Sequence, residues 1–371
     1  MEYWIWLRQL SGIGTVLEKR LLDRCKSPKS IYEANAEELM LVAGIGAALA
    51  KVIRQNRSLD QAESILEKAL KNDMKLLTYH DPLYPVLAKE YRDAPTLLYY
   101  KGQLRKNSTG VVIVGSRRCT AYGKRAAVEA SGFLAENNIP VISGMAKGID
   151  GYAHTGCLKA GGYTIAFLGN GVDICYPKEH QALMDAIIEN GAVISQYPPN
   201  TKPWPEYFPQ RNALISSWGE KVLVIEAAEK SGALITAAFA KEQGKEVYAL
   251  PHEIYNPSGR GANQLIADGV NIYLHPSQLL TDYDAVKKET KLAGKILTGT
   301  KGRTEKHSYR DGTALTDTER KILSSISSAP KTIEQIGVDI GIDQLKLIEI
   351  LSMMELSGLI HTMSGGRFGR T

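Results

Sequence analysis

The sequence predicts a mixed α/β protein. A mostly parallel sheet is expected between an all-α N-terminal domain and a C-terminal winged-helix domain. Three observations predict this class. Short runs rich in Val, Ile and Tyr alternate with helix-length segments over residues 109–283. Two G-I-G turns lie between amphipathic segments in residues 1–79, and a Gly-Gly turn follows the helical pattern of residues 314–371. With 371 residues, the chain has room for about two or three domains of ordinary size.

Residues 1–79 are expected to be helical throughout. The strings "LSGIGTVLEKRLL" and "VAGIGAALAKVI" each place a G-x-G turn before an amphipathic helix, as in helix-hairpin-helix (SAM-like) modules. Such a turn directs backbone N–H groups outward at a helix N-terminus, where they suit one phosphate. A G-x-G turn can also simply join two helices, so both interpretations stay open for each hairpin. Residues 80–108, with the strand-like "TLLYYKG", are predicted to form a bridge that packs against the next domain.

Residues 109–283 are predicted to form the sheet. The expected strands are "VVIVG", "PVISG", "YTIAFLG", "AVISQY", "KVLVIEA", "EVYALP" and "NIYL", and helix-length segments lie between most of them. Apolar strands joined by helical crossovers make parallel sheets covered on both faces. Ligands of such sheets bind in the loops that follow the carboxyl ends of the strands. The functional site is therefore expected in these loops.

The C-terminal part divides into two segments. Residues 284–313 are polar and basic without periodicity, which predicts a flexible linker. Residues 314–371 begin with Thr316 or Asp317 as a helix N-cap and continue through a short helix, a turn near Gly341, a longer helix and a Gly-Gly hairpin. This is a winged helix-turn-helix pattern. Its longer helix, "IDQLKLIEILSMMELSG", has few base-reading polar groups, so DNA contact, protein docking and a structural use all stay open.

Four of the expected strand ends share one composition, small residues with a basic side chain. Small residues expose backbone N–H groups to an anion, and Arg or Lys adds positive charge. The first of these loops lacks the dinucleotide fingerprint G-x-G-x-x-G. One such loop is often only a tight turn, but four at one edge of a sheet predict a basic trough for several phosphates. The predicted members are Gly115, Ser116, Arg117, Ser143, Gly144, Lys147, Gly148, Asn170, Lys178, Lys230 and Ser231.

A fifth element, "PPNTKPWPEYFPQRNALISSWG", interleaves aromatic and basic residues. Single-stranded nucleic acid binds such surfaces because bases stack on rings while phosphates pair with cations, at about 1–3 kcal/mol per stacked base. Phe208 is the expected stacking residue, and Arg211 and Asn212 begin the helix that follows. The alternative is that the aromatic side chains only fill the gap between the sheet and the linker.

Other classes of function find little support in the sequence. The net charge of +5 is a mild excess. The four cysteines have no C-x-x-C spacing, which favours reduced thiols and no metal site. No apolar run is long enough to span a membrane, and a cytoplasmic protein is expected. No catalytic motif or cofactor is predicted. His154 is interpreted as a packed or surface histidine, and Asp150 as an N-cap that shapes its loop.

Six strings in order strongly resemble the bacterial DNA-processing proteins of the DprA/Smf family: "VGSRRCTAYG", "SGMAKGIDGYAH", "GNGVDICYPKEH", "SQYPPNTKPWPEYFPQRNALI", "SGALITAAFAKEQGKEVYALP" and "GANQLIADG". The three-part layout also fits this family. The resemblance implies an extended Rossmann fold that binds single-stranded DNA, forms a homodimer and has no enzymatic activity. It further implies protection of incoming DNA and its delivery to RecA during natural transformation, with single-strand-binding protein as a further partner.

The resemblance also implies roles for particular residues. It places the family's DNA-binding arginine on Arg117 and its groove residues on Lys147, Lys178, Phe208 and Arg211. The string "HEIYNPSGRGAN" keeps the Asn of a family loop as Asn263. Two departures leave the DNA affinity open. Ala213 stands where the family commonly has a second arginine, and Pro251-His252 stands where Pro-Gly is usual.

Two alternative functions are weighed against DNA binding in the central domain. A nucleotide phosphoribohydrolase would use a related scaffold, but its P-G-G-x-G-T-x-x-E signature is missing, and "IEAAEKSGALITA" stands in a comparable place. A third hypothesis makes the terminal domains readers of duplex DNA.

Overall fold

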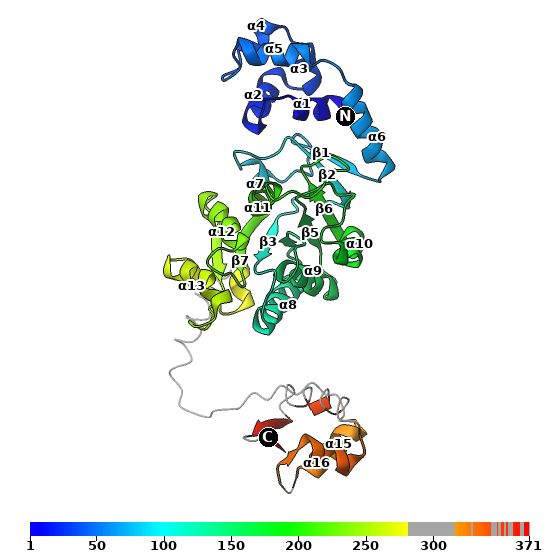
Figure 1. Ribbon diagram of the computed structural model, residues 1–371, viewed down its shortest axis with the longest axis vertical. Helices are drawn as coiled ribbons and strands as arrows, with labels where there is room; N and C mark the ends of the chain where they lie inside the picture. Colours follow the sequence, from blue (N-terminus) through cyan, green and yellow to red (C-terminus); the bar gives the residue numbers. More distant parts are fainter. Residues whose placement is uncertain are drawn as a thin grey trace, which may run out of the picture. The chain divides into compact units, whose positions relative to one another are not determined.

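The computed structural model describes residues 1–280, 316–327, 329–342, 347, 350–351, 354, 359–363 and 367–370. The chain divides into two units, Met1–Ala293 and Gly294–Thr371, which are described separately (Figure 1). The predicted linker, residues 284–313, lies outside the described residues, as does most of the longer helix predicted after Gly341.

The first unit begins with a helical region that contains both predicted hairpins. Gly12 and Gly44 adopt φ of +76° and +95°, a backbone conformation that favours glycine. A Cβ on Gly12 would lie 3.1 Å from Leu49 Cδ2, and one on Gly44 would lie 2.8 Å from Leu17 Cδ2. Leu17 and Leu49 follow their G-I-G turns at the same spacing, so the two hairpins pack on each other reciprocally. The helices are α1 (Glu2–Gln9), α2 (Thr15–Cys25), α3 (Pro28–Glu33), α4 (Ala36–Met40), α5 (Ala47–Gln55) and α6 (Asp60–Lys71).

A nine-stranded sheet follows, in the order β1-β2-β6-β5-β4-β3-β7-β8-β9. Neighbouring strands pair in parallel from β6 through β5, β4, β3, β7 and β8 to β9. Strands β1 and β2 add an antiparallel edge beside β6. Every predicted strand is present. The strands are β1 (Lys75–Thr78), β2 (Leu97–Gly102), β3 (Gly110–Val114), β4 (Val141–Ser143), β5 (Thr164–Phe167), β6 (Gly191–Ser195), β7 (Gly219–Val224), β8 (Glu246–Ala249) and β9 (Asn271–Ile272).

The edge strand β1 corrects the expectation that residues 1–79 are entirely helical. Lys75–Thr78 pairs with β2, which comes from the predicted bridge and is buried along Leu97–Tyr100. A buried carboxylate joins the helical region to this edge. Glu18 Oε1 accepts a hydrogen bond from Arg8 Nη1 at 2.8 Å, and Oε2 accepts one from Thr96 Oγ1 at 2.6 Å.

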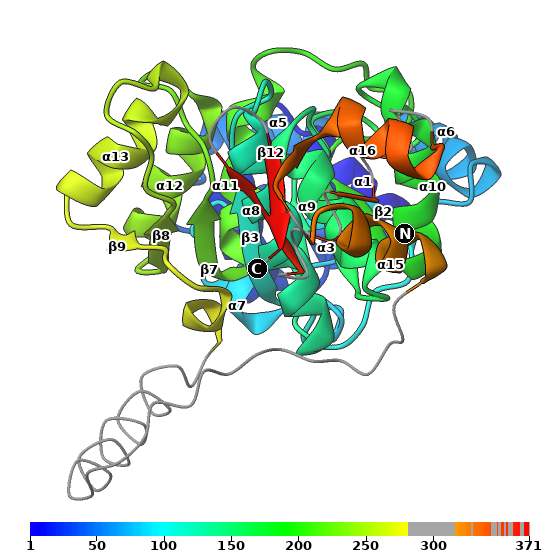
Figure 2. The same ribbon diagram turned by 90° about the horizontal axis from the view of Figure 1, so that it is seen from below.

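Helices cover both faces of the sheet. Val111 and Ile113 pack with α8 and α9 on one face, whereas Val112 and Val114 pack with α11 and α12 on the other, as the two-residue period of a strand requires. In Figure 2 β7, β8 and β9 follow one another toward α13. The helices are α7 (Val86–Lys89), α8 (Ala121–Glu136), α9 (Ile149–Lys159), α10 (Gln181–Asn190), α11 (Tyr207–Trp218), α12 (Gly232–Glu242) and α13 (Arg260–Ala267). Short 3₁₀ turns are η1 (Lys178–His180), η2 (Pro257–Gly259) and η3 (Pro276–Leu279).

Strand β3 lies at the point where the strand order reverses. The chain runs from β3 through β4 and β5 to β6 on one side, and then returns to place β7, β8 and β9 on the other. The loops after β3 and β7 therefore diverge above the sheet and leave a crevice, where open α/β sheets bind ligands. The fold thus places the first predicted phosphate loop beside this crevice.

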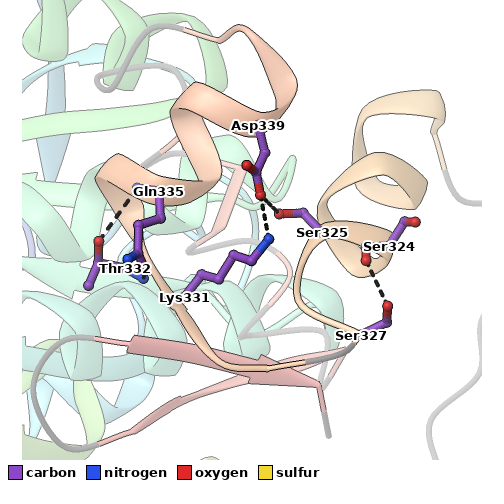
Figure 3. Close-up of polar contacts among 7 residues, drawn as sticks. All are labelled: Ser324, Ser325, Ser327, Lys331, Thr332, Gln335 and Asp339. Atoms are coloured by element: carbon purple, nitrogen blue, oxygen red, sulfur yellow. Dashed lines mark hydrogen bonds and ion pairs between the residues drawn. The ribbon is translucent and has the colours of Figure 1, made fainter.

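The second unit contains the described parts of a winged-helix domain. Thr316 and Thr332 each cap a helix through a capping box, with Glu319 and Gln335 as partners. Asp339 Oδ2 accepts hydrogen bonds from Ser325 Oγ and Lys331 Nζ, both at 2.6 Å, and so joins the two helices and the first strand (Figure 3). The elements are α15 (Asp317–Ser325), β10 (Lys331–Thr332), α16 (Ile333–Ile340), β11 (Ile360–Met363) and β12 (Arg367–Arg370), with sheet order β10-β12-β11.

Candidate nucleic-acid interface

A cavity of about 640 Å³ occupies the crevice between the loops that follow β3 and β7. A smaller cavity of about 60 Å³ adjoins it and shares several of its walls. We call the two together the trough. Of the predicted residues, the trough is lined by Gly115, Ser116, Arg117, Gly144, Lys147, Asn170, Phe208, Arg211, Asn212, Lys230 and Ser231. Ser143, Gly148, Lys178 and Asn263 line neither cavity.

Arg117 is the exposed cation of the loop after β3. It forms no ion pair within the described part of the chain, and its guanidinium carbon lies 5.6 Å from the centre of the Phe208 ring. The neighbouring Arg118 is also exposed but lines neither cavity. The two adjacent arginines therefore differ: only Arg117 contributes to the trough.

The Phe208 ring lies at the boundary between the two cavities. It packs over Gly169, where a Cβ would lie 3.2 Å from Phe208 Cδ1. Tyr176 is 42% exposed, lines both cavities and places its ring centre 5.9 Å from that of Phe208. Tyr176 was not among the predicted site residues, although it belongs to the string "GNGVDICYPKEH" that follows β5. The trough therefore offers two adjacent aromatic side chains with a free cation beside them.

Arg211 is placed differently from the expectation of an open groove charge. It is only 5% exposed, and Nη1 donates to the carbonyl oxygens of Phe167, at 2.8 Å, and Gly144. Burial lowers the pKa of Arg211 to about 10, and the nearby Asp150 carboxylate partly offsets that effect. Arg211 is thus a buried cation that ties the loops after β4 and β5 to α11, and it reaches the trough only as part of its wall.

Asp150 shapes its loop, but not as the predicted N-cap. The N-cap of α9 is Gly148, and Asp150 lies one residue inside the helix after Ile149. Its Oδ2 accepts the backbone N–H groups of Gly144 at 3.2 Å and Ala146 at 3.4 Å. Burial raises the pKa of Asp150, whereas the Arg211 charge acts in the opposite direction.

Three other predicted residues support the loops from below. Ser143 is buried and donates from Oγ to the Ile113 carbonyl at 2.6 Å. Asn170 is also buried, and its amide donates to the carbonyls of Gly171 at 2.9 Å and Ile174 at 2.7 Å. Gly148 has φ of +77°, and a Cβ there would clash with Ser116 and Arg117. Ser143 and Gly148 therefore position the trough without lining it, whereas Asn170 both holds its loop and lines the smaller cavity.

The remaining basic residues lie at the rim. Lys147 lines the smaller cavity and forms an exposed ion pair with Glu179 of η1. Lys178, also in η1, is exposed outside both cavities. On the opposite side Ser231 caps α12, and Lys230 is exposed beside it. The basic groups therefore follow the trough from η1 to the start of α12.

Asn263 and His154 lie outside the trough. The Asn263 side chain accepts from the His252 N–H at 2.9 Å and donates to the His252 carbonyl at 3.0 Å, so it closes the loop where His252 replaces the usual glycine. His154 is buried with Nδ1 2.7 Å from Thr164 Oγ1. Burial lowers its pKa to about 3, which keeps the ring neutral. The packed alternative predicted for His154 agrees with this position.

Among the described residues no group of three or more His, Cys, Asp or Glu side chains could hold a metal ion. Nor does any described helix combine the length and hydropathy needed to cross a bilayer.

Comparisons with known proteins match all three parts of the chain. The model of DNA recombination-mediator protein A matches residues 75–284. A SAM-like helix-hairpin-helix tandem matches residues 7–55, and the DprA winged helix domain matches residues 306–366. Protein Smf of Synechocystis is 32% identical, over 99% of this chain and 98% of that protein.

Two solved structures share the fold. DNA processing protein A from Streptococcus pneumoniae superimposes with a TM-score of 0.65 and 31% identity, covering 74% of this chain and 94% of that one. DNA processing protein A from Helicobacter pylori, solved for its single-stranded DNA binding mode, has a TM-score of 0.52 and 26% identity, covering 59% of this chain and 98% of that one. These matches confirm the predicted fold class and the predicted resemblance. The chain therefore belongs to the DNA recombination-mediator protein A family, whose members include the proteins named DprA and Smf.

Proposed function

We propose that this protein binds single-stranded DNA along the trough and, as a cytoplasmic recombination mediator, protects the incoming strand and delivers it to RecA during natural transformation. One observation carries the proposal: the exposed Arg117 lies beside Phe208 at the crevice where the strand order reverses. The relative from Helicobacter pylori, which binds single-stranded DNA, supports it.

The trough favours a single strand because a base must be unpaired to stack on a ring. Phe208 and Tyr176 present two such rings at the junction of the cavities. Arg117 and the rim lysines Lys147 and Lys230 supply positive charge for the phosphates that connect successive bases. Because this charge is local, the mild net charge of +5 is sufficient.

We propose that the trough carries out no bond-breaking chemistry. Two acidic side chains at or below the trough serve its loops: Asp150 accepts two backbone N–H groups, and Glu226 accepts a hydrogen bond from the Thr120 hydroxyl. The competing hypothesis, a nucleotide phosphoribohydrolase, needs a carboxylate that faces the substrate. Release of free base from nucleoside monophosphates by the purified protein would establish that hypothesis instead.

We also propose a homodimer, with RecA and single-strand-binding protein as partners. The β8–β9 edge of the first unit supports self-association, because it exposes Ile254, Tyr255 and Leu274 at 72%, 85% and 70%. Contiguous apolar patches commonly mark interaction surfaces, and we propose that these three side chains form such a patch. Light scattering of the wild type and of Tyr255→Asp tests this: a monomeric variant supports the assignment, and an unchanged dimer contradicts it.

The central test is a salt titration of oligonucleotide binding by fluorescence anisotropy. Wild type is expected to prefer a single strand over a duplex. Arg117→Glu is expected to weaken binding about tenfold or more and to lower the slope of log affinity against log salt by about 0.7, the value for one phosphate contact. Arg118→Glu is the matched control, since it makes the same charge change one residue outside the trough. Equal losses in both variants would contradict the proposed path.

RecA-mediated strand exchange gives the second readout. With the oligonucleotide coated by single-strand-binding protein, wild type is expected to accelerate exchange, and Arg117→Glu is expected to lose the effect. Acceleration that survives in Arg117→Glu would separate the RecA role from the trough.

A further inference from the structure

Glu226 is a fully buried carboxylate directly below the trough. It follows β7, is 0% exposed, and takes part in no ion pair among those formed in the described residues. Burying a charge in this way is costly unless donors replace the lost water. The structure must therefore provide those donors nearby.

The donors come from the start of α8. Glu226 Oε2 accepts the backbone N–H of Thr120 at 3.0 Å and its hydroxyl at 2.7 Å. Thr120 is the N-cap of this helix, and its Oγ1 in turn accepts the Gly123 N–H at 3.1 Å. The carboxylate thus completes a chain of hydrogen bonds into the first turn of α8. It also gains from the positive end of the helix dipole.

The first turn of α8 leaves space for this carboxylate and for little else. A Cβ on Gly123 would lie 2.6 Å from Glu226 Oε2. Glycine at this position is therefore required for the close approach, and the approach places the negative charge against the helix N-terminus.

In a dinucleotide-binding sheet the same place has another occupant. The first strand–helix turn at the reversal point receives the ligand's pyrophosphate, at the N-terminus of the helix that follows. In this protein β3 and α8 form that turn, and the protein's own carboxylate already occupies the helix N-terminus.

We infer that Glu226 is an internal anion that closes the α8 N-terminus to nucleotide phosphates and holds the loop from Gly115 to Thr120 so that Arg117 faces the trough. Glu226 is a positioning residue, because it acts through Thr120 and touches no ligand. The inference deepens the proposed function and rests on it for the part that concerns Arg117. It explains how a Rossmann-like loop binds single-stranded DNA along its surface instead of a nucleotide phosphate at the helix N-terminus.

The test compares Glu226→Ala, Glu226→Gln and Glu220→Ala in the full chain. Glu220 is the matched control because its exposed carboxylate lies at the opposite end of β7, where it accepts from Thr109 Oγ1. Thermal unfolding is measured in sodium formate, sodium phosphate and sodium chloride of equal ionic strength. Formate and phosphate should raise the melting temperature of Glu226→Ala above its value in chloride, because a small anion can bind at the α8 N-terminus in place of the missing carboxylate. Wild type, Glu226→Gln and Glu220→Ala should gain nothing from formate, and from phosphate only the smaller increase that this salt gives to folded proteins in general.

Affinity for oligo-dT gives the second arm. Glu226→Ala should lose about tenfold, the scale expected when buried donors lose their acceptor. Formate should restore most of the affinity that Glu226→Ala loses. Glu226→Gln should bind oligo-dT about as tightly as wild type, because its amide oxygen still accepts from Thr120. An Ala variant that neither responds to formate and phosphate nor loses affinity would overturn the inference. Since the anion response is measured without DNA, it remains decisive even if Arg117 proves not to bind the strand.

A third arm needs only the conservative variant, in case Glu226→Ala does not fold. Burial raises the pKa of the Cys119 thiol, and the Glu226 charge raises it further. Removing that charge in Glu226→Gln should lower the thiol pKa and speed alkylation of Cys119 by iodoacetamide near pH 8, as resolved by peptide mass spectrometry. Cys175 serves as the internal reference. An unchanged Cys119 rate would show that no negative charge sits at the α8 N-terminus.

Discussion

Replacing Arg211 by Met separates two roles that the sequence alone merges, a ligand for phosphate and a support for the loops. The structure predicts the second. Arg211 gives up hydrogen bonds to the Gly144 and Phe167 carbonyls and leaves Asp150 without its counter-charge. A buried acceptor left without its donor costs about 1–3 kcal/mol of unfolding free energy, and in this variant two carbonyl oxygens lose theirs. Urea unfolding of Arg211→Met should therefore show a loss of this size.

Two further variants make this prediction specific. Asp150→Asn combined with Arg211→Met should recover part of the loss, because the buried Asp150 charge that the Arg211 charge favours is then removed as well. Arg125→Met, an exposed arginine of α8, should change the unfolding free energy by less than about 0.5 kcal/mol. The reasoning is refuted if Arg211→Met unfolds like wild type yet loses as much affinity for single-stranded DNA as Arg117→Glu. That outcome would make Arg211 a direct phosphate ligand.

Two more predictions concern Phe208 in the trough and Lys245 at the amino end of β8. Phe208→Ala should weaken oligo-dT binding by about 1–3 kcal/mol without changing the salt slope, whereas Phe208→Tyr should retain binding; anisotropy titrations at several salt concentrations check both. Burial lowers the pKa of Lys245 to about 8 from 10.5. Between these values the unfolded chain binds more protons than the folded one, so the unfolding free energy should rise with pH from about 8 to 10, and Lys245→Met should lack this rise in urea unfolding.

The sequence predicted the sheet well because its signals are local. Most of the buried strands are short runs that contain Val or Ile, and helix-length segments lie between most of them. The missed strand, Lys75–Thr78, is a four-residue segment, KLLT, without a run of Val or Ile. It follows α6 after a short turn, and its strand conformation depends on pairing with β2, a contact between segments that the sequence presents as separate.

The candidate site was predictable to a smaller extent, for a related reason. Sequence composition indicates which loops carry glycine and basic residues, and the strand order brings those loops together. It does not indicate which side chains turn inward. Arg117 and Arg211 look alike in the sequence, yet one is exposed and the other is buried beneath Gly144. Asn263 was included because of a family resemblance, but it binds the backbone of His252 outside the trough. The DNA-binding set as a whole stays a prediction.

The missing glycines of the first loop now have a physical explanation. A dinucleotide loop needs glycine so that backbone N–H groups can approach a pyrophosphate closely at the helix N-terminus. In this protein Thr120 directs its N–H group to Glu226, and that end of α8 no longer needs an outside anion. The loop is then free to carry Ser116 and Arg117, and an arginine reaches farther from the backbone than an N–H group does. An anion held at that distance can belong to a strand that crosses the crevice, with its bases beside Phe208. Ser116 and Arg117, which stand in place of the fingerprint glycines, therefore fit the loop to contact a polymeric ligand.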